Sequence, residues 1–574
     1  MIQPTYGVLQ NFFADRVFRI PHYQRFYSWQ ARQREDLFSD ILKLADQNAD
    51  QHHFMATLVC YRTPETKTIG TSQFRVYDIV DGQQRLTTLI ILLKCIELAL
   101  AKTSEDRADL AKILVKRDGL LILLQTNNAN ERIFNRFIRE GVCPSKDDLQ
   151  LQSDDNIANA ITDCMEFIEK WSRTRSVESL MSLVLQRLDF VVHDTEDSRA
   201  VYTVFEVLNS RGLDVDWLDK TKSMLMGRAF EQLEGSAAEA EIQSLQNLWA
   251  EIYRELAKKD VPGDEILRVT ATLRFGAGAG KPRSADDSLD TLRNACDSSD
   301  KPRQMSEWLL GYAKKLTELH SNICLGPVTD ILHARLLAVA IMAADQLTDP
   351  ERKKLLEQWE RVTFRIFGLY GKDARTKVGD YVRLAAKIAG NDIDCQTFNQ
   401  IMAALRSLGS GYPVVDAVNQ GLAGKPCYED EPDVCRYVLW SYEEHLAAIF
   451  GGDTTIDEHA RAAIWRKRAT DSLEHIFPQS AGDPDGWRGK MKREGERKEN
   501  IQKHVHRIGN LLLLPKRLNQ VASVKPFAEK KTIYEKHAIR MVKEVCETPD
   551  WTLDQIEARE EAIIEWAMTR WDDV

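Results

Sequence analysis

The chain has 574 residues, 43% of them hydrophobic and 29% charged, as expected for a globular protein of roughly three domains of ~150 residues each. Its net charge of −10 argues against a protein that coats nucleic acid indiscriminately, and Lys94 and Glu97 interrupt its longest apolar run, which excludes a membrane span there. The first twenty residues lack the apolar segment of a secretory signal and the ten cysteines form no C-x-x-C pair, so we expect a cytoplasmic protein.

Aromatic side chains are concentrated in residues 18–41, where Pro21 fixes an extended backbone. The aromatic residues that follow this proline are Tyr23, Phe26, Tyr27 and Trp29. Such rings can stack on a base or a sugar while Arg25 supplies positive charge. The same cluster also fits the packed edge of a hydrophobic core, and the residues alone favour that interpretation.

Two strands, a polar turn and a helix are predicted next. Residues 53–60 and 74–80 have the composition of strands, and residues 86–101 have the pattern of a buried helix. The turn before this helix reads Asp81-Gly82-Gln83-Gln84-Arg85. Backbone N–H groups and the helix dipole favour an anion at such a turn, where Arg85 can donate to a phosphate and Asp81 can hold a metal or orient water.

A further strand is predicted for residues 188–194, and another helix begins at Trp217. Between them, Asn209 and Gly212 suit the C-terminal turn of a helix. Arg211 is an unusual residue at that position if capping is its only role. This turn is therefore a second candidate functional segment.

Residues 223–455 repeat apolar side chains every three or four positions and contain no exact repeat. This pattern predicts an irregular helical region, which we interpret as a spacer or a dimerisation domain of a homodimer. Gly451 and Gly452 indicate a linker at its end.

Two short motifs near the C-terminal end carry a candidate catalytic site. Glu474 and His475 precede Pro478, and further along the chain Asn510 opens an apolar run that Asn519 follows. Carboxylate and amide oxygens suit Mg²⁺ (or Mn²⁺), and a neutral imidazole can take a proton from water. A histidine on an amphipathic segment before an ordinary helix is the alternative, but four positions at this spacing favour catalysis.

The residues around this site are strongly basic. Residues 486–545 contain 16 Lys and Arg residues against 6 Asp and Glu residues, which suits binding to a phosphate backbone as well as a solvated charged face. Pro484-Asp485 with Glu496-Arg497-Lys498 resembles a PD-(D/E)-x-K nuclease motif. That chemistry needs adjacent strands, and this charged segment lacks β-branched residues, so the sequence disfavours it.

The spacing of the C-terminal motifs resembles the ββα-metal (HNH, or His-Me finger) nuclease motif, from Glu474-His475-x-x-Pro478 to Asn510 and Asn519. The resemblance implies that His475 is the general base and that Glu474 and Asn519 are metal ligands. It also implies that Asn510 holds the loop that carries the base.

The N-terminal third contains three longer motifs. IPHYQRFYSW at 20–29, DGQQRLTTL at 81–89 and FEVLNSRG at 205–212 with a following DxxK resemble the GmrS domain, which has a ParB/sulfiredoxin-like fold. Together with the C-terminal motifs, the chain resembles fused GmrSD-type, modification-dependent (type IV) restriction endonucleases.

This second resemblance implies that the N-terminal domain binds and hydrolyses an NTP. The residues implied for the nucleotide are Asp81, Gly82, Gln83, Gln84 and Arg85, with Asn209 and Arg211 as the second edge of the pocket. The residues implied for sensing a DNA modification, or for contacting the nucleotide, are Tyr23, Gln24 and Arg25.

We therefore expect a multidomain α+β protein with a nucleotide-binding α/β sensor domain at 1–222, a helical spacer at 223–455 and an HNH-type nuclease domain at 456–574. The expected function is NTP-regulated, Mg²⁺-dependent cleavage of modified foreign (phage) double-stranded DNA, with His475 as the base. The alternative is an NTP-hydrolysing, DNA-binding sensor that recruits a partner nuclease, its own nuclease domain being vestigial.

Overall fold

The computed structural model describes most of the chain and divides it into two compact units. Unit 1 comprises Met1–Ala271 and Arg283–Thr317, and unit 2 comprises Thr272–Pro282 and Glu318–Val574. The residues not described are 1–3, 14–15, 49, 70–71, 117–120, 127–130, 198–199, 202–215, 234, 260, 277, 323–324, 326–327, 329, 450–457, 466–467, 481–486, 488–497, 536–538 and 574. The three-domain division expected from the sequence stays a prediction.

In the described part of unit 1, six strands form a mixed sheet in the order β1-β8-β3-β4-β2-β7. Strand β3 is antiparallel to β4 and parallel to β8, while β2 is parallel to both β4 and β7. The strands are β1 (Pro4–Val8), β2 (Arg16–Ile20), β3 (His53–Ile69), β4 (Ser72–Asp81), β7 (Leu124–Thr126) and β8 (Leu188–Thr195). A short pair, β5 (Val115–Lys116) and β6 (Leu121–Ile122), lies apart from this sheet.

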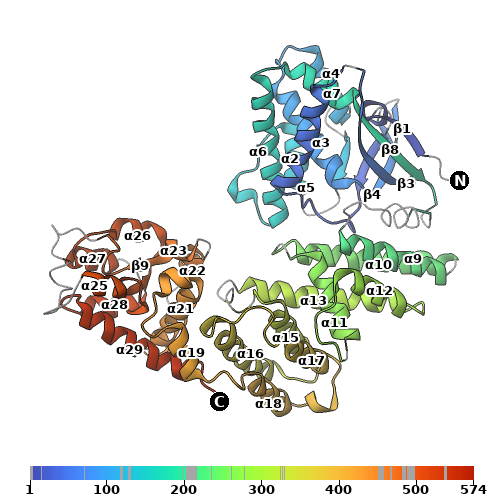
Figure 1. The fold of residues 1–574 in the computed structure, drawn as a ribbon. Helices are drawn as coiled ribbons and strands as arrows, with labels where there is room; N and C mark the ends of the chain where they lie inside the picture. The colour runs from blue at the N-terminus through green and yellow to red at the C-terminus, as the bar shows by residue number, and fades with distance from the viewer. Residues whose placement is uncertain are drawn as a thin grey trace. The chain divides into compact units, whose positions relative to one another are not determined.

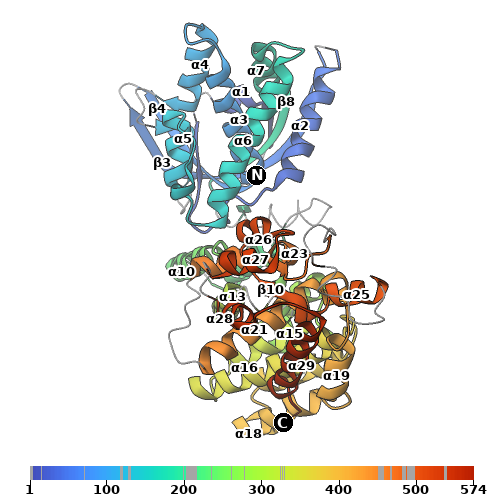
Figure 2. The same ribbon diagram turned by 90° about the vertical axis from the view of Figure 1, so that its left-hand side faces the viewer.

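Helices cover one face of this sheet, as Figure 1 shows, and they face the viewer in Figure 2. They are α2 (Ala31–Ala45), α3 (Gln83–Ala99), α4 (Glu105–Leu114), α5 (Glu131–Glu140), α6 (Gln152–Ser172) and α7 (Val177–Gln186), with the short α1 (Leu9–Phe12) nearby. One hydrophobic core joins these helices to the sheet. Within buried α3, Lys94 and Glu97 form an ion pair at 2.6 Å, which explains how two charges interrupt an apolar helix.

The strands expected at 53–60, 74–80 and 188–194 and the helix expected at 86–101 are confirmed by β3, β4, β8 and α3. The helical pattern of residues 223–455 is likewise confirmed over its described part. The helices that follow the sheet are α9 (Trp217–Gln232), α10 (Gly235–Leu256), α11 (Gly263–Phe275), α12 (Ala285–Ala295) and α13 (Lys301–Ser321). None of the described helices is both long and apolar enough to cross a membrane.

Unit 2 is almost entirely helical in its described part. Its first helices are α15 (Leu332–Met342), α16 (Asp349–Thr363) with the π-helical η3 (Phe364–Leu369), α17 (Val378–Ala389), α18 (Phe398–Leu408), α19 (Val414–Gly421), α20 (Cys427–Asp430) and α21 (Pro432–Ile449). Its later elements are α22 (Glu458–Trp465), α23 (Ala469–Ser472), β9 (Leu473–His475), α25 (Lys498–Val505), β10 (Leu511–Leu513), α26 (Lys516–Ala522), α27 (Phe527–Tyr534), α28 (Arg540–Glu547) and α29 (Leu553–Arg570). Gly451 and Gly452, the expected linker, lie outside the described residues.

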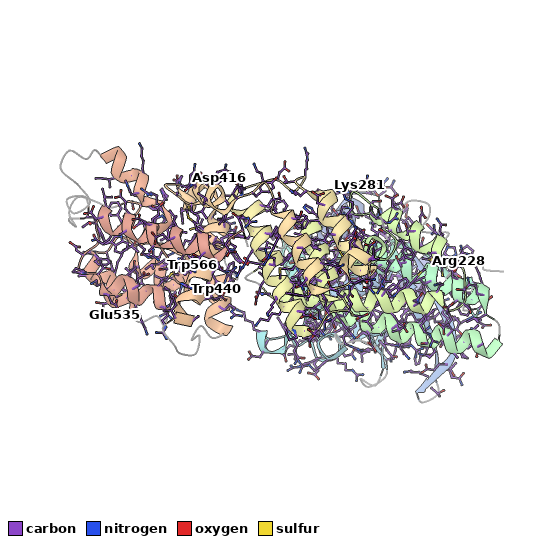
Figure 3. The ribbon with its side chains drawn as sticks, turned by 90° about the horizontal axis from the view of Figure 1, so that it is seen from below. Arg228, Lys281, Asp416, Trp440, Glu535 and Trp566 are labelled. Atoms are coloured by element: carbon purple, nitrogen blue, oxygen red, sulfur yellow. The ribbon has the colours of Figure 1, made fainter. Side chains whose placement is uncertain are left out.

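The last helix of unit 2 packs back onto helices that come much earlier in the chain. Trp571 is fully buried; its indole N–H donates to Glu360 of α16 at 2.9 Å, and Arg365 donates to its carbonyl at 3.1 Å. Tyr442 of α21 contacts Trp566 of α29, labelled in Figure 3, with ring centroids 5.1 Å apart. These contacts close the core of unit 2.

Candidate functional site

The two C-terminal motifs meet in a small antiparallel sheet of unit 2. Strand β9 pairs with β10 so that His475 lies opposite Leu511 and Glu474 opposite Leu512. Helix α26 follows directly after Pro515, whose fixed φ suits the start of a helix. Residues that are distant in sequence therefore form a strand–strand–helix arrangement with Glu474, His475 and Asn510 at its centre.

Asn510 fixes the turn that follows β9. It is fully buried, and its side-chain oxygen accepts the backbone N–H of Phe477 at 2.8 Å and the indole N–H of Trp551 at 3.1 Å. Its amide nitrogen donates to the carbonyls of Phe477 at 3.0 Å and Val505 at 2.8 Å. Two acceptor and two donor positions are thus used, which is the full capacity of an asparagine side chain.

The imidazole of His475 is buried among polar and aromatic neighbours. Its Nε2 lies 3.2 Å from Nδ1 of His506, its Nδ1 lies 3.0 Å from the amide nitrogen of Gln479, and the ring of Tyr428 packs edge-on at 4.4 Å. Burial, followed by the charges of His506 and Lys530, lowers the pKa of His475 to about 3. The imidazole is therefore neutral at physiological pH and able to accept a proton.

Glu474, the next residue along β9, has different neighbours. Its Oε1 accepts from the Lys530 ammonium at 2.7 Å and from the Tyr534 hydroxyl at 2.9 Å. Lys530 is fully buried and also donates to the His475 carbonyl at 2.6 Å. Burial raises the pKa of Glu474 and lowers the pKa of Lys530, and their mutual contact opposes both shifts.

Asn519 and Lys530 share the edge of β9 that does not face β10. The amide nitrogen of Asn519 donates to the carbonyls of Asp471 and Leu473, each at 3.1 Å, and Lys530 donates to the carbonyl of His475. Because both hydrogens of the Asn519 amide point at the strand, its oxygen faces away from these carbonyls. Side chains thereby satisfy an edge that would otherwise expose unpaired backbone groups.

The donor chemistry at this edge fits a divalent cation. A carboxylate and an amide oxygen are hard ligands of the kind that Mg²⁺ takes from a protein, with water and phosphate completing its coordination. The Glu474 carboxylate has further lone pairs beyond the two bonds to Oε1. The positive charge of Lys530 offsets the negative charge of Glu474, so the site as a whole carries little net charge. We therefore expect weak cation binding unless phosphate is present.

In unit 1, the predicted phosphate-binding turn joins β4 to α3. Gly82 has a φ of 87°, and a Cβ there would lie 2.4 Å from the side chain of Leu58, so only glycine fits this turn. Burial raises the pKa of Asp81. The guanidinium of Arg85 lies 5.8 Å from the ring centre of Trp29. The turn thus places a carboxyl group and a guanidinium at the N-terminus of a buried helix.

Two glutamines expected at the ligand sites hold backbone groups in the structure. Gln84 accepts the backbone N–H of Ser28 at 2.8 Å and donates to the carbonyl of Phe26 at 2.9 Å. Gln24 donates to the carbonyls of Ile79 and Val80 at the end of β4. Together they attach the aromatic loop at 21–30 to the turn of the DGQQR motif.

Arg25 belongs to a buried ionic cluster that sequence reasoning found only in part. Its guanidinium lies 3.1 Å from Asp219 and 3.4 Å from Asp216, both at the start of α9. Lys222 of the same helix donates to the Gln24 oxygen at 2.6 Å. Asp219 and Lys222 are the DxxK residues of the third N-terminal motif, which was the available signal. The contact of Asp219 with Arg25 has no local pattern in the sequence.

Arg25 and Asp216 also line a pocket of about 590 Å³ within unit 1. Its wall combines aromatic and amide side chains with a hydroxyl, namely Phe26, Tyr27, Trp29, Tyr253, Gln30, Gln33, Gln152, Asn156 and Ser153. Of the three expected sensing residues, Arg25 lines this pocket. Tyr23 and Gln24, which precede it in the sequence, are buried. Such a wall can stack on a planar ring and hydrogen-bond its edges.

Some expected site residues cannot be placed. Asn209 and Arg211 lie outside the described residues, as do Pro484, Asp485, Glu496 and Arg497 of the disfavoured second nuclease pattern. Within the described residues, no group of three or more His, Cys, Asp and Glu side chains is arranged to hold a metal ion. The cation site considered above depends on one carboxylate and one amide.

Comparisons with family models match both ends of the chain. Residues 8–226 match the N-terminal domain of the GmrSD restriction endonucleases, and residues 412–566 match the C-terminal domain of the same enzymes. Together these matches cover more than half of the chain, and the protein belongs to the GmrSD restriction endonuclease family. No curated protein matches the chain.

Proposed function

We propose that this protein is an NTP-regulated, Mg²⁺-dependent (or Mn²⁺-dependent) endonuclease that cleaves modified foreign double-stranded DNA with His475 as its general base. The observation that carries the proposal is the buried imidazole of His475, presented by β9 beside β10 and α26, with Asn510 holding the turn that follows β9. Membership of the restriction endonuclease family supports DNA as the substrate.

The C-terminal site acts in this proposal as a ββα-metal (HNH-type) nuclease. His475 accepts the proton of the attacking water, and Asn510 keeps the turn after β9 in position. A divalent cation held by Glu474 and Asn519 supplies charge stabilisation for the phosphate when it is bound. The basic residues between 486 and 545 attract the DNA backbone.

The N-terminal unit acts as the nucleotide-dependent sensor, with a ParB/sulfiredoxin-like fold for its mixed sheet. The turn from Asp81 to Arg85 binds the phosphates of the NTP at the N-terminus of α3. The aromatic and amide wall of the 590 Å³ pocket, with Arg25, binds a ring of the nucleotide or of the modified DNA. The helical region that follows is a spacer or a dimerisation surface.

The cysteines support a reducing compartment such as the cytoplasm. All nine cysteines among the described residues are free, and most of them are buried. Phage DNA entering a cell would meet the enzyme there.

The decisive experiment measures cleavage of modified and unmodified phage DNA by the purified full chain with Mg²⁺ and each NTP. We expect wild type to cleave modified DNA and His475→Ala to lose about 10²–10⁴-fold in rate, because a general base typically contributes that factor. The control is His52→Ala, a substitution of an exposed histidine of unit 1 that should cleave normally.

Cleavage by His475→Ala at the wild-type rate would refute the assignment of the base. If wild type binds modified DNA and hydrolyses NTP but never cleaves, the alternative of a sensor that recruits a partner nuclease is correct. A partner nuclease pulled down with the chain would then be the next measurement.

A further inference from the structure

Three side chains of unit 2, Glu429, His506 and His475, lie in a row that ends at His475. Glu429 of the short helix α20 lies 3.2 Å from Nε2 of His506, and Nδ1 of His506 lies 3.2 Å from Nε2 of His475. Neither Glu429 nor His506 belongs to the motifs that identify the nuclease site. The carboxylate is largely exposed, whereas both imidazoles are buried.

Contacts with Tyr428 hold the two imidazoles in place. The ring of Tyr428 stacks on His506 with centroids 5.6 Å apart and packs edge-on against His475 at 4.4 Å. The backbone N–H of Tyr428 donates to the carbonyl of His506 at 3.2 Å. One residue of α20 thus contacts both imidazoles, while the next residue supplies the carboxylate.

The position of the hydrogen on each imidazole follows from the negative group at the end of the row. The Glu429 carboxylate lies 3.2 Å from Nε2 of His506 and favours the hydrogen of this imidazole on Nε2. In a neutral imidazole the other nitrogen is then an acceptor, so Nδ1 of His506 accepts from Nε2–H of His475. Nδ1 of His475 is therefore the nitrogen that carries a lone pair and no hydrogen.

A separate contact agrees with this assignment. The amide nitrogen of Gln479, a donor, lies 3.0 Å from Nδ1 of His475 and 3.4 Å from Nε2. A donor closest to Nδ1 is what an unprotonated Nδ1 requires. Gln479 itself is exposed, whereas His475 is buried.

We propose that Glu429 and His506 are positioning residues that hold His475 in the tautomer protonated at Nε2, so that Nδ1 takes the proton of the attacking water. The inference rests on the proposed nuclease function only for its last clause. The tautomers of the two histidines are set by the geometry whether or not the protein cleaves DNA.

The test combines NMR and kinetics on the full chain. Long-range ¹H–¹⁵N correlation spectra of protein labelled at histidine nitrogens report which nitrogen of each imidazole is protonated, and His475→Ala and His506→Ala assign the two spin systems. We expect both imidazoles to be protonated at Nε2 in wild type. In His506→Ala and Glu429→Ala, the His475 signals should move towards a mixture of tautomers.

The kinetics should follow the tautomer. We expect His506→Ala to lower kcat about 10–100-fold with little change in KM, as substitution of a residue that orients a catalytic group typically does. His506→Asn keeps an acceptor oxygen near the position of Nδ1 and should recover most of the rate. The matched control is His504→Ala, because His504 also pairs with a carboxylate, Glu557 at 3.0 Å, without a link to His475.

Two results would overturn the proposal. One is a wild-type His475 protonated at Nδ1, and the other is His506→Ala that cleaves at the wild-type rate with an unchanged His475 spectrum. Failure of wild type to cleave any DNA would count against the proposed function alone, because the NMR spectra decide the tautomers without it.

Discussion

The imidazole of His475 links the chemistry of the C-terminal site to its stability. Its pKa is about 3 in the folded protein, because burial and the charges of His506 and Lys530 disfavour the protonated form. In an unfolded chain a histidine titrates near ~6.5. The unfolded state therefore binds more protons between these two values, and folding stability must fall as the pH is lowered through that window.

The first prediction concerns this pH dependence. Above pH ~6.5 the contribution of His475 is complete, and each pH unit below that value should cost about 1.4 kcal/mol of unfolding free energy until pH ~3. Urea unfolding of wild type and His475→Ala between pH 7 and 5 measures it. The unfolding free energy of wild type minus that of His475→Ala should decrease as the pH falls. A difference that does not change with pH would show that the imidazole is not held neutral.

The second prediction concerns Asn510. Asn510→Ala leaves the N–H of Phe477 and the indole of Trp551 buried without an acceptor, and each such loss typically costs about 1–3 kcal/mol. We expect at least about 3 kcal/mol of destabilisation in chemical unfolding. Asn519→Ala, which loses two bonds at a partly exposed strand edge, should cost clearly less. Equal losses would contradict the clamping role of Asn510.

At the scale of single elements, the outer edge of β9 has a structural role beside the catalytic role that we propose. Asn519 and Lys530 satisfy its carbonyls, and Lys530 also contacts the carboxylate of Glu474, which we propose as a metal ligand together with Asn519. Because the Lys530 charge offsets Glu474, cation binding should depend strongly on the remaining amide oxygen. Loss of Asn519 should therefore affect the metal requirement more than the fold.

The third prediction follows from this edge. Asn519→Ala should raise the Mg²⁺ concentration for half-maximal cleavage about tenfold or more, and Mn²⁺ should recover part of the activity because it binds nitrogen and oxygen ligands more tightly than Mg²⁺. The measurement is a metal titration of cleavage rate. Gln520→Ala, an exposed neighbour on α26, is the control. Identical titrations for Asn519→Ala and wild type would remove Asn519 from the ligand set.

Local sequence patterns were sufficient for elements whose side chains repeat regularly. Alternating and β-branched residues predicted β3, β4 and β8, and apolar periodicity predicted α3 and the helical middle. Strand β2 was not predicted, because one of its charges is neutralised from another strand: Arg19 pairs with Asp78 of β4. That compensation is visible only when the two strands are side by side.

The same limit applies to the candidate site. The spacing of the two motifs singled out Glu474 and His475, which lie on β9, Asn510, which directly precedes β10, and Asn519, which lies on α26. Lys530 was not predicted, because its position within α27 follows no motif. It nevertheless contacts both Glu474 and His475. Long-range partners of a motif are fixed by tertiary packing, which a single sequence does not display.

At the scale of the whole molecule, the proposed nucleotide site and the proposed nuclease site belong to different compact units. Asp81 and Arg85 lie in unit 1, and His475 lies in unit 2. We expect neither set of residues to take part in the chemistry of the other. Any influence of NTP on cleavage must therefore be a coupling free energy between two states of the protein, typically about 1–3 kcal/mol.

The fourth prediction separates the two sites. Arg85→Ala should lose NTP binding or hydrolysis and with it the NTP dependence of cleavage, whereas His475→Ala should keep hydrolysis and lose cleavage. NTP hydrolysis and cleavage of modified DNA are measured side by side for both variants. If Arg85→Ala cleaves with an unchanged response to NTP, the two units are independent enzymes on one chain and the regulatory part of the proposal is wrong.

The contacts of Trp571 with Glu360 and Arg365 also have a consequence for biosynthesis. The indole and its carboxylate acceptor are 211 residues apart in the chain. At a translation rate of about 5–20 residues per second, the ribosome adds the tryptophan roughly 10–40 s after the glutamate. Until then α16 lacks a partner that completes its core. If a ribosome stalls late in the message, the released polypeptide lacks Trp571 and its unit 2 is unfinished. We therefore expect no active DNA-cutting fragment before synthesis reaches this tryptophan.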